Sequence, residues 1–291
     1  MKEDDHIISS AFLFGNTNSF FGTLQKLGIE VTFVDATEAR FVENAIQKNT
    51  KLVFVETIAN PVTQVADLKA IGQLCKTKNL IYCVDNTMTS PCLFLPKSVG
   101  ASLIVNSLTK YIGGHGNALG GAITDTGLYN WSSFENIYDT YRNEEPELWG
   151  ITQIKKKGLR DMGASLGPEA AHHLAIGSET LSLRIKKACK NALALAEFCQ
   201  KHSKIKQTYY PGFFRSPTTR AGATTFLNNL DQFLALIWQM TWTASNFSMQ
   251  WITLFLPAIS ATTELSRFLL LTLFITKWVR SAEPQWVSLI Q

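Results

Sequence analysis

The sequence lacks the features that mark several common protein classes. Its five cysteines are odd in number and form no C-x-x-C pair, which argues against a disulfide framework and favours reduced thiols in a cytoplasmic protein. No block of basic residues accompanies the net charge of +4, so neither nucleic acid nor an anionic membrane is expected as a partner. The residues KEDDH after Met1 contain neither the basic nor the apolar region of a signal peptide, which again favours a cytoplasmic location.

Membrane spans and metal ligands are also missing from the pattern. The apolar run FLLLTLFI at 268–275 is too short to cross a bilayer. His172 and His173 are adjacent on one predicted helix and cannot both face one ion, so no metal is expected. What the chain does have is 291 residues with 46% hydrophobic content, which is enough for one large domain or two smaller ones.

Apolar, β-branched runs alternate with amphipathic runs through the first third of the chain. The apolar runs are nearly continuous, as strands covered on both faces must be, and the amphipathic runs have helical spacing. This order predicts an α/β protein with a mostly parallel, three-layer sheet. The predicted strands are residues 31–35, 51–56, 80–85 and 102–107, and the predicted helices are residues 39–47, 67–78 and 179–200.

Polar residues close three of the predicted strands. Glu56, Asp85 and Ser107 each end an apolar run, and open α/β sheets bind their ligands at the carboxyl ends of strands. For any one of these residues, a simple exit of the strand into solvent is the better interpretation. The three together, with Lys110 just beyond the last, indicate a site.

The residue types around Lys110 suggest one chemistry. A lysine amine forms a Schiff base with an aldehyde cofactor, and pyridoxal phosphate also needs a carboxylate on its pyridinium nitrogen, a role open to Asp85. Ser107 and Thr109 are candidates to bind the phosphate, and the glycines at 113–121 allow close approach of backbone. A phosphate-binding glycine loop is the competing interpretation, but there the lysine would have to follow the glycines.

Four segments carry a resemblance to a known family. They are FVETIANP (54–61), VDNTMTSP (84–91), NSLTKYIGGHG (106–116) and GSETLSLR (177–184). They resemble the Cys/Met-metabolism family of pyridoxal-phosphate enzymes, and TDTGLYNW with GLRDMGASLGPEAAHHL most resembles its O-acetylhomoserine sulfhydrylase branch. The resemblance runs in order from about residue 7 to about residue 226.

The resemblance implies a fold, a function and a set of site residues. The fold is that of the PLP-dependent transferases of type I, like aspartate aminotransferase, and the assembly is a homo-oligomer. The function is γ-replacement or γ-elimination on an O-acylhomoserine-type amino acid, with methionine γ-lyase or cystathionine lyase activity as the alternative. Lys110 is then the Schiff-base lysine, Asp85 the partner of the pyridinium nitrogen, Ser107 and Thr109 the phosphate ligands, and Asn60 the neighbour of the cofactor's 3-oxygen.

Phe14 departs from the family pattern. It stands in FGNT, where the family usually has Tyr-Gly-x-Thr with the tyrosine ring stacked on the cofactor. A phenylalanine ring can stack but cannot exchange a proton. On residue type alone, a core aromatic between two strands is about as well supported.

Both ends of the chain also depart from the pattern. The resemblance implies a preceding N-terminal part with a Gly-Met loop and a Tyr-x-Arg pair that complete the phosphate site. After Gly222 glycine is absent, and codons allowed for residues 275–290 can, read one nucleotide earlier, spell a segment like the family's own C-terminus. We therefore predict a frameshift near residues 226–240.

The predicted organisation follows from these departures. Residues 1–175 form the PLP-binding large domain without its N-terminal part, 176–230 begin an incomplete C-terminal small domain, and 231–291 form an aberrant tail. Two functions are compatible with this: an active trans-sulfuration enzyme, or an inactive fragment of one.

Overall fold

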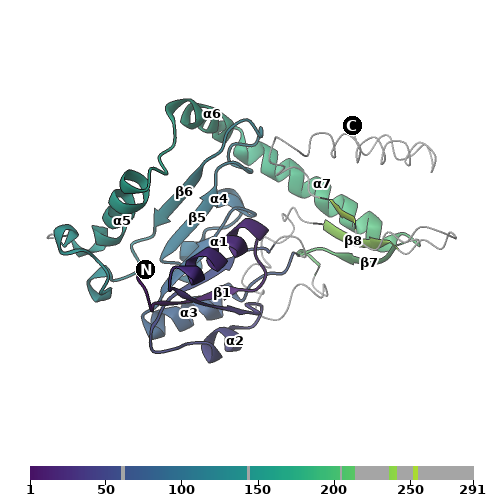
Figure 1. Ribbon diagram of the computed structural model, residues 1–291. Coiled ribbons are helices and arrows are strands. Elements are labelled where there is room, and N and C mark those ends of the chain that lie inside the picture. The colour runs from purple at the N-terminus through teal and green to yellow at the C-terminus, as the bar shows by residue number, and fades with distance from the viewer. Residues whose placement is uncertain (60–62, 143–144, 204, 214–235, 241–251, 255–291) are drawn as a thin grey trace.

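The structure is a computed structural model that describes residues 1–59, 63–142, 145–203, 205–213, 236–240 and 252–254 (Figure 1). Its centre is a six-stranded sheet with the strand order β2-β1-β3-β4-β5-β6. All neighbours in this sheet are parallel except β5 and β6, which are antiparallel. The strands are β1 (His6–Ser10), β2 (Glu30–Val34), β3 (Thr50–Glu56), β4 (Ile81–Asp85), β5 (Leu103–Ser107) and β6 (Gly121–Asp125).

The helices connect and cover this sheet. The α-helices are α1 (Gly15–Lys26), α2 (Ala39–Asn44), α3 (Leu68–Lys78), α4 (Ser90–Leu93), α5 (Trp149–Gln153), α6 (Pro168–Glu179) and α7 (Leu181–Lys201). Short 3-10 turns are η1 (Pro96–Val99), η2 (Trp131–Ser133), η3 (Asp139–Tyr141) and η4 (Pro146–Leu148), and η5 (Ile154–Asp161) is a π-helix. None of the helices within the described ranges is both long and apolar enough to cross a membrane.

The four predicted strands and three predicted helices are confirmed, with boundaries that differ by at most three residues. The sequence did not predict β1, α1 or β6. Strand β1 pairs with both β2 and β3, yet its sequence HIISS has few apolar residues. It tolerates burial because the His6 ring is hydrogen-bonded on both sides, with Nδ1 2.7 Å from Thr50 Oγ1 and Nε2 2.9 Å from Thr32 Oγ1.

The three layers follow from the alternation of side chains along the strands. Val53 and Val55 of β3 join a cluster with residues of α2 and α3, whereas Phe54 faces the opposite side and packs on α1. The Phe54 ring meets the Phe21 ring of α1 edge to face, with centroids 5.3 Å apart. Helices therefore cover both faces of the sheet, as the continuous apolar runs predicted (Figure 1).

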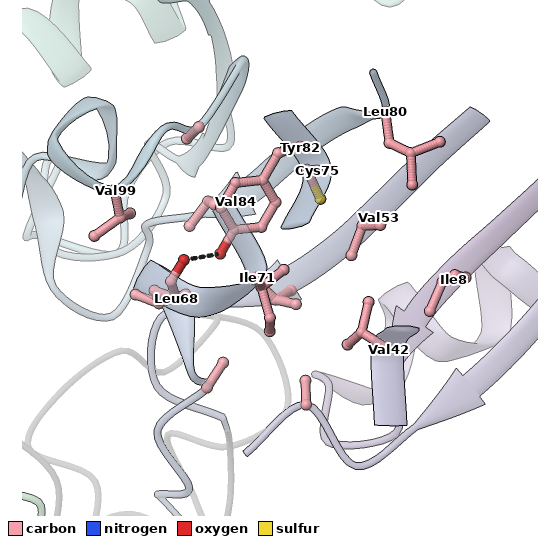
Figure 2. Packing of buried hydrophobic residues seen from close by; sticks show 14 of the residues in the cluster. Ile8, Val42, Val53, Leu68, Ile71, Cys75, Leu80, Tyr82, Val84 and Val99 are labelled. Atoms are coloured by element: carbon pink, nitrogen blue, oxygen red, sulfur yellow. Dashed lines mark hydrogen bonds between the residues drawn. The ribbon is translucent and has the colours of Figure 1, made fainter. Parts of the chain in front are cut away.

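Helix α3 is anchored to the sheet through Tyr82. Figure 2 shows the Tyr82 ring between Leu68, Ile71 and Val84, with its hydroxyl turned toward the backbone of α3. The hydroxyl donates to the Leu68 carbonyl oxygen at 3.2 Å. Burial raises the pKa of Tyr82 well above its ordinary value, which keeps the phenol protonated as a donor.

A second, smaller sheet follows α7. It contains β7 (Ile205–Tyr209), β8 (Leu236–Met240) and β9 (Ile252–Leu254), all antiparallel to their neighbours. Figure 1 shows α7 running from the region of α6 and β5 to this sheet. Apart from β8 and β9, the predicted out-of-frame tail over 231–291 lies outside the described residues.

Two helical glycines provide a matched test of packing. A methyl group on Gly72 of α3 would lie 1.8 Å from the Val99 carbonyl oxygen, whereas one on Gly22 of α1 has no neighbour within 4 Å. Alanine is the better helix former by about 1 kcal/mol, so Gly22→Ala should stabilise the fold by roughly 0.5–1 kcal/mol. Gly72→Ala should instead destabilise it by about 1–3 kcal/mol, because backbone must move. Urea unfolding measures both, and equal effects would refute this packing.

Candidate active site

Three neighbouring strands bring polar residues to one edge of the sheet. In the parallel register Glu56 of β3 pairs with Asp85 of β4, and Asp85 pairs with Val105 of β5, two residues before Ser107. The prediction that Glu56, Asp85 and Ser107 lie at the carboxyl ends of adjacent strands is therefore confirmed. This edge is where a parallel α/β sheet offers space for a ligand.

Asp85 is a partly buried carboxylate. Desolvation raises the pKa of its carboxyl group, and two hydrogen bonds from Thr87 act in the opposite direction. The Thr87 backbone N–H donates to Oδ1 at 2.9 Å. No lysine or arginine of the described ranges forms an ion pair with Asp85. A desolvated acid without a cation is suited to receive one from a ligand.

Thr87 joins Asp85 to the next strand. Its hydroxyl contributes a side-chain hydrogen bond to Asp85, and its Oγ1 accepts the backbone N–H of Ser107 at 2.8 Å. One side chain thus sets the position of the acid on β4 relative to the end of β5. No role was predicted for Thr87, although a threonine two residues after an aspartate is typical of an Asx turn.

Lys110 lies in a tight turn directly after β5. Its backbone N–H donates to the Ser107 carbonyl oxygen at 3.2 Å, and its own carbonyl accepts the Gly114 N–H at 2.7 Å. The Nζ atom is 5.7 Å from the centroid of the Phe14 ring. The turn therefore directs the lysine amine toward the N-terminal end of α1, where Phe14 stands.

Phe14 is not a core aromatic between two strands, so that interpretation of the sequence is wrong. It precedes the first residue of α1, and 42% of it is exposed. Its backbone N–H donates to Glu56 Oε1 at 2.7 Å, which ties it to the end of β3. The ring is available to a ligand on the side of Lys110, as stacking requires.

Thr109 is engaged with the glycine segment that leads into β6. Its Oγ1 accepts the Gly120 N–H at 3.0 Å, and its hydroxyl donates to the Gly120 carbonyl oxygen at 3.3 Å. The same carbonyl accepts the Leu108 N–H at 2.9 Å. The hydroxyl proton can therefore turn to an anion without leaving that carbonyl unpaired.

A buried polar network lies behind Asp85, and no sequence pattern predicted it. Thr57 Oγ1 is 3.2 Å from Thr89 Oγ1, which in turn hydrogen-bonds the Asn86 side chain. The Asn86 amide nitrogen donates to the Phe94 carbonyl oxygen at 3.0 Å. These bonds fix the chain on both sides of the acid.

The remaining predicted site residue, Asn60, lies outside the described residues.

The residue types at this edge fit pyridoxal phosphate as a ligand. An amine, a desolvated acid with no cationic partner in the described ranges and an accessible aromatic ring lie at one edge, with two hydroxyl residues beside the amine. The fold and site thus define an α/β protein whose lysine and acid could hold an aldehyde cofactor. The chain belongs to the Cys/Met metabolism PLP-dependent enzyme family, whose sequence profile matches residues 1–260.

Individual relatives support the same assignment. The chain is 38% identical over 220 residues to an L-methionine gamma-lyase of Fusobacterium nucleatum subsp. polymorphum, covering 75% of this chain and 50% of that protein. It is 36% identical over 231 residues to an O-acetyl-L-homoserine sulfhydrylase of Leptospira meyeri, covering 73% and 52%. The chain thus spans about half the length of these relatives.

Solved structures agree on the fold. An O-acetylhomoserine sulfhydrylase of Wolinella succinogenes is similar with a TM-score of 0.74 and 34% identity, over 82% of this chain and 67% of that one. A structure described as an O-acetylhomoserine (thiol)-lyase of Campylobacter jejuni has a TM-score of 0.71 and 30% identity, over 82% and 62%, and contains a pyridoxyl-lysine. The predicted PLP-dependent transferase fold of type I is confirmed.

Asp85 gives a testable link between stability and pH. Because its folded-state pKa lies above the ordinary value of 3.8, ionisation destabilises the fold as the pH rises through the folded-state value. Asp85→Asn removes this penalty and keeps an acceptor for the Thr87 N–H. Without cofactor, the variant should therefore melt at a higher temperature than the wild type at pH 7, and the gap should close near pH 4.

The control is Asp139→Asn, whose side chain is 99% exposed, so that its substitution relieves no burial and should not raise the melting temperature at pH 7. Differential scanning calorimetry between about pH 4 and about pH 8 measures the melting temperatures of both variants. A melting temperature for Asp85→Asn equal to or below that of the wild type at pH 7 would contradict the desolvated-acid assignment.

Proposed function

We propose that this chain carries the cofactor site of a trans-sulfuration enzyme that performs γ-replacement or γ-elimination on O-acylhomoserine-type amino acids. The observation that carries the proposal is the approach of the Lys110 amine to the Phe14 ring, on the same edge as the Asp85 carboxylate, which pairs with no cation among the described residues. Relatives named as sulfhydrylases and as a methionine gamma-lyase support the reaction class. The γ-lyase reaction on methionine is the second candidate.

Each residue has a distinct task in this proposal. Pyridoxal phosphate, when bound, supplies an aldehyde carbon for a lysine amine and a ring that withdraws electrons. Lys110 Nζ would hold that carbon, with the aldehyde oxygen leaving as water. Once the substrate's amine has displaced it, the freed Nζ would take the proton from the substrate's Cα. Asp85 would stabilise a proton on the ring nitrogen, and this contact would offset the free-energy cost of desolvating the acid. Phe14 covers the ring and excludes water from that face.

The turn after β5 is proposed to bind the phosphate group of the cofactor. Ser107 and Thr109 are the proposed donors, and the Thr109 hydroxyl turns from the Gly120 carbonyl to do so. Asn60 is proposed beside the 3-oxygen of the ring. Two hydroxyls alone hold a phosphate weakly, so donors in addition to Ser107 and Thr109 would tighten the site.

The setting of the enzyme is part of the proposal. We infer a homo-oligomer, supported by exposed apolar side chains such as Leu119, Met162 and Leu183, which are 73%, 84% and 72% exposed. A cytoplasmic location is supported by five free cysteines. We also propose the division into a large domain over 1–175, the start of a small domain over 176–230 and an aberrant tail over 231–291.

Lys110→Ala tests the lysine assignment. The wild type incubated with pyridoxal phosphate should gain a visible absorbance that survives dialysis, and borohydride should fix the cofactor on the peptide that contains Lys110. Lys110→Ala should lose both signals because it has no amine at this position. Lys97→Ala, a lysine exposed in η1, is the matched control and should keep them. Fixation mainly on other lysines of the wild type would refute the assignment.

Turnover separates the two functional candidates from an inactive fragment. O-acetylhomoserine with sulfide tests γ-replacement, and methionine alone tests γ-elimination. Cofactor binding at Lys110 with neither reaction would establish the inactive fragment, because it would leave binding without catalysis.

Phe14→Tyr tests whether the aromatic position limits proton transfer. The new hydroxyl would stand near the Lys110 amine and could move a proton to or from the leaving group. We expect thiol release from methionine to rise by roughly 10²-fold or more, with cofactor affinity little changed. Phe20→Tyr, at a 57% exposed position on the same helix, should have no effect. An unchanged rate in Phe14→Tyr would argue against a proton-transfer role at this position.

A further inference from the structure

The turn that carries Lys110 is held by an arginine from α7. Arg184 Nη1 donates to the Tyr111 carbonyl oxygen at 2.8 Å, and Nη2 donates to the Ile112 carbonyl oxygen at 3.2 Å. These are the first two carbonyls after the lysine. Arg184 thus contacts the main chain of the turn across 72 and 73 residues of sequence.

The same guanidinium is fixed on its own side. Nη2 also donates to the Gly177 carbonyl oxygen at 2.7 Å, and Nε donates to Thr180 Oγ1 at 3.0 Å. Every one of these partners is uncharged, and no carboxylate within the described part of the chain forms an ion pair with Arg184. The planar fork of donors is therefore used to join two pieces of backbone.

Close packing at glycines makes this contact possible. A Cβ on Gly114, whose φ is +73°, would lie 2.2 Å from Arg184 Nη1. A Cβ on Gly177 would lie 2.0 Å from the Gly113 carbonyl oxygen. Any larger residue at either position would push the turn away from the junction of α6 and α7. The side chain of Tyr111 is buried in the same junction, beside Leu181 and Ile185.

We propose that Arg184 is a positioning residue for Lys110, and this rests on the function proposed above. By fixing the carbonyls of Tyr111 and Ile112, it restricts the turn to the conformation that directs the lysine amine toward the Phe14 ring. The amine then meets the aldehyde without first ordering its own backbone, which is the benefit of preorganisation. The arrangement also makes the start of α7 a structural requirement of the cofactor site.

Arg184→Ala is the direct test, with Arg142→Ala as its matched control. Arg142 also donates to two carbonyls, those of Ile137 and Glu135, each at 3.2 Å, but it contacts no residue of the lysine turn. We expect Arg184→Ala to slow the appearance of the visible cofactor absorbance by at least about tenfold and to spread borohydride-fixed label to other lysines. Arg184→Lys should be intermediate because it keeps the charge without the fork.

A second pair of variants leaves the arginine in place. Gly114→Ala puts a methyl group against the guanidinium, whereas Gly127→Ala meets nothing within 4 Å, and the two glycines have nearly equal φ angles of +73° and +72°. Both substitutions carry the same backbone strain. Only Gly114→Ala should slow the labelling of Lys110, so this pair remains informative if Arg184→Ala fails to fold.

Hydrogen exchange separates this proposal from the proposed function. The amides of Gly113 and Gly114 donate within the turn, to Leu108 at 2.8 Å and Lys110 at 2.7 Å. In the cofactor-free protein, exchange at both amides should accelerate about tenfold or more in Arg184→Ala and stay unchanged in Arg142→Ala. Unchanged exchange would overturn the positioning role whatever the wild type does with cofactor. Faster exchange in Arg184→Ala, together with a wild type that never labels Lys110, would refute only the proposed function.

Discussion

Desolvation of the Asp85 carboxylate is the constraint on which the site depends. The acid ends a central strand of a sheet covered by helices on both faces, and no basic residue of the described ranges pairs with it. Thr87 partly offsets the cost with hydrogen bonds that keep the pKa of Asp85 from rising further. In the proposed site a bound cation would offset the remaining cost, so the desolvation that lowers the stability of the fold would favour a ligand with a protonated ring nitrogen.

The site is assembled mainly through backbone contacts. Ser107 is joined to Thr87 by its N–H, Phe14 to Glu56 by its N–H, and the turn of Lys110 to Arg184 by two carbonyls. These bonds place Ser107, Phe14 and the lysine turn through main-chain atoms, whereas Thr109 is held through its own hydroxyl. Main-chain contacts of this kind order the edge of the sheet before a ligand binds.

Much of the architecture could be predicted from periodicity. The buried strands 50–56 and 81–85 have continuous apolar runs, and α3 has a clear apolar stripe, so their pattern is independent of distant residues. Strand β1 could not be found in this way, because only Ile7 and Ile8 of HIISS are apolar, and its buried His6 depends on Thr32 and Thr50 of neighbouring strands for hydrogen bonds. The exposure of Phe14 could not be predicted either, because it depends on where α1 begins relative to β3.

The sequence by itself determined the family, the position of the lysine proposed for the cofactor and the order of strands that brings three polar residues to one edge. Residue identity and spacing are enough for this, because the carboxyl ends of adjacent parallel strands must lie together. Only the tertiary structure decided that the acid lacks a cation among the described residues, that Thr87 joins two strands, and that Arg184 reaches a turn 72 residues away. These depend on desolvation and on contacts between distant segments, which no local pattern of residues encodes.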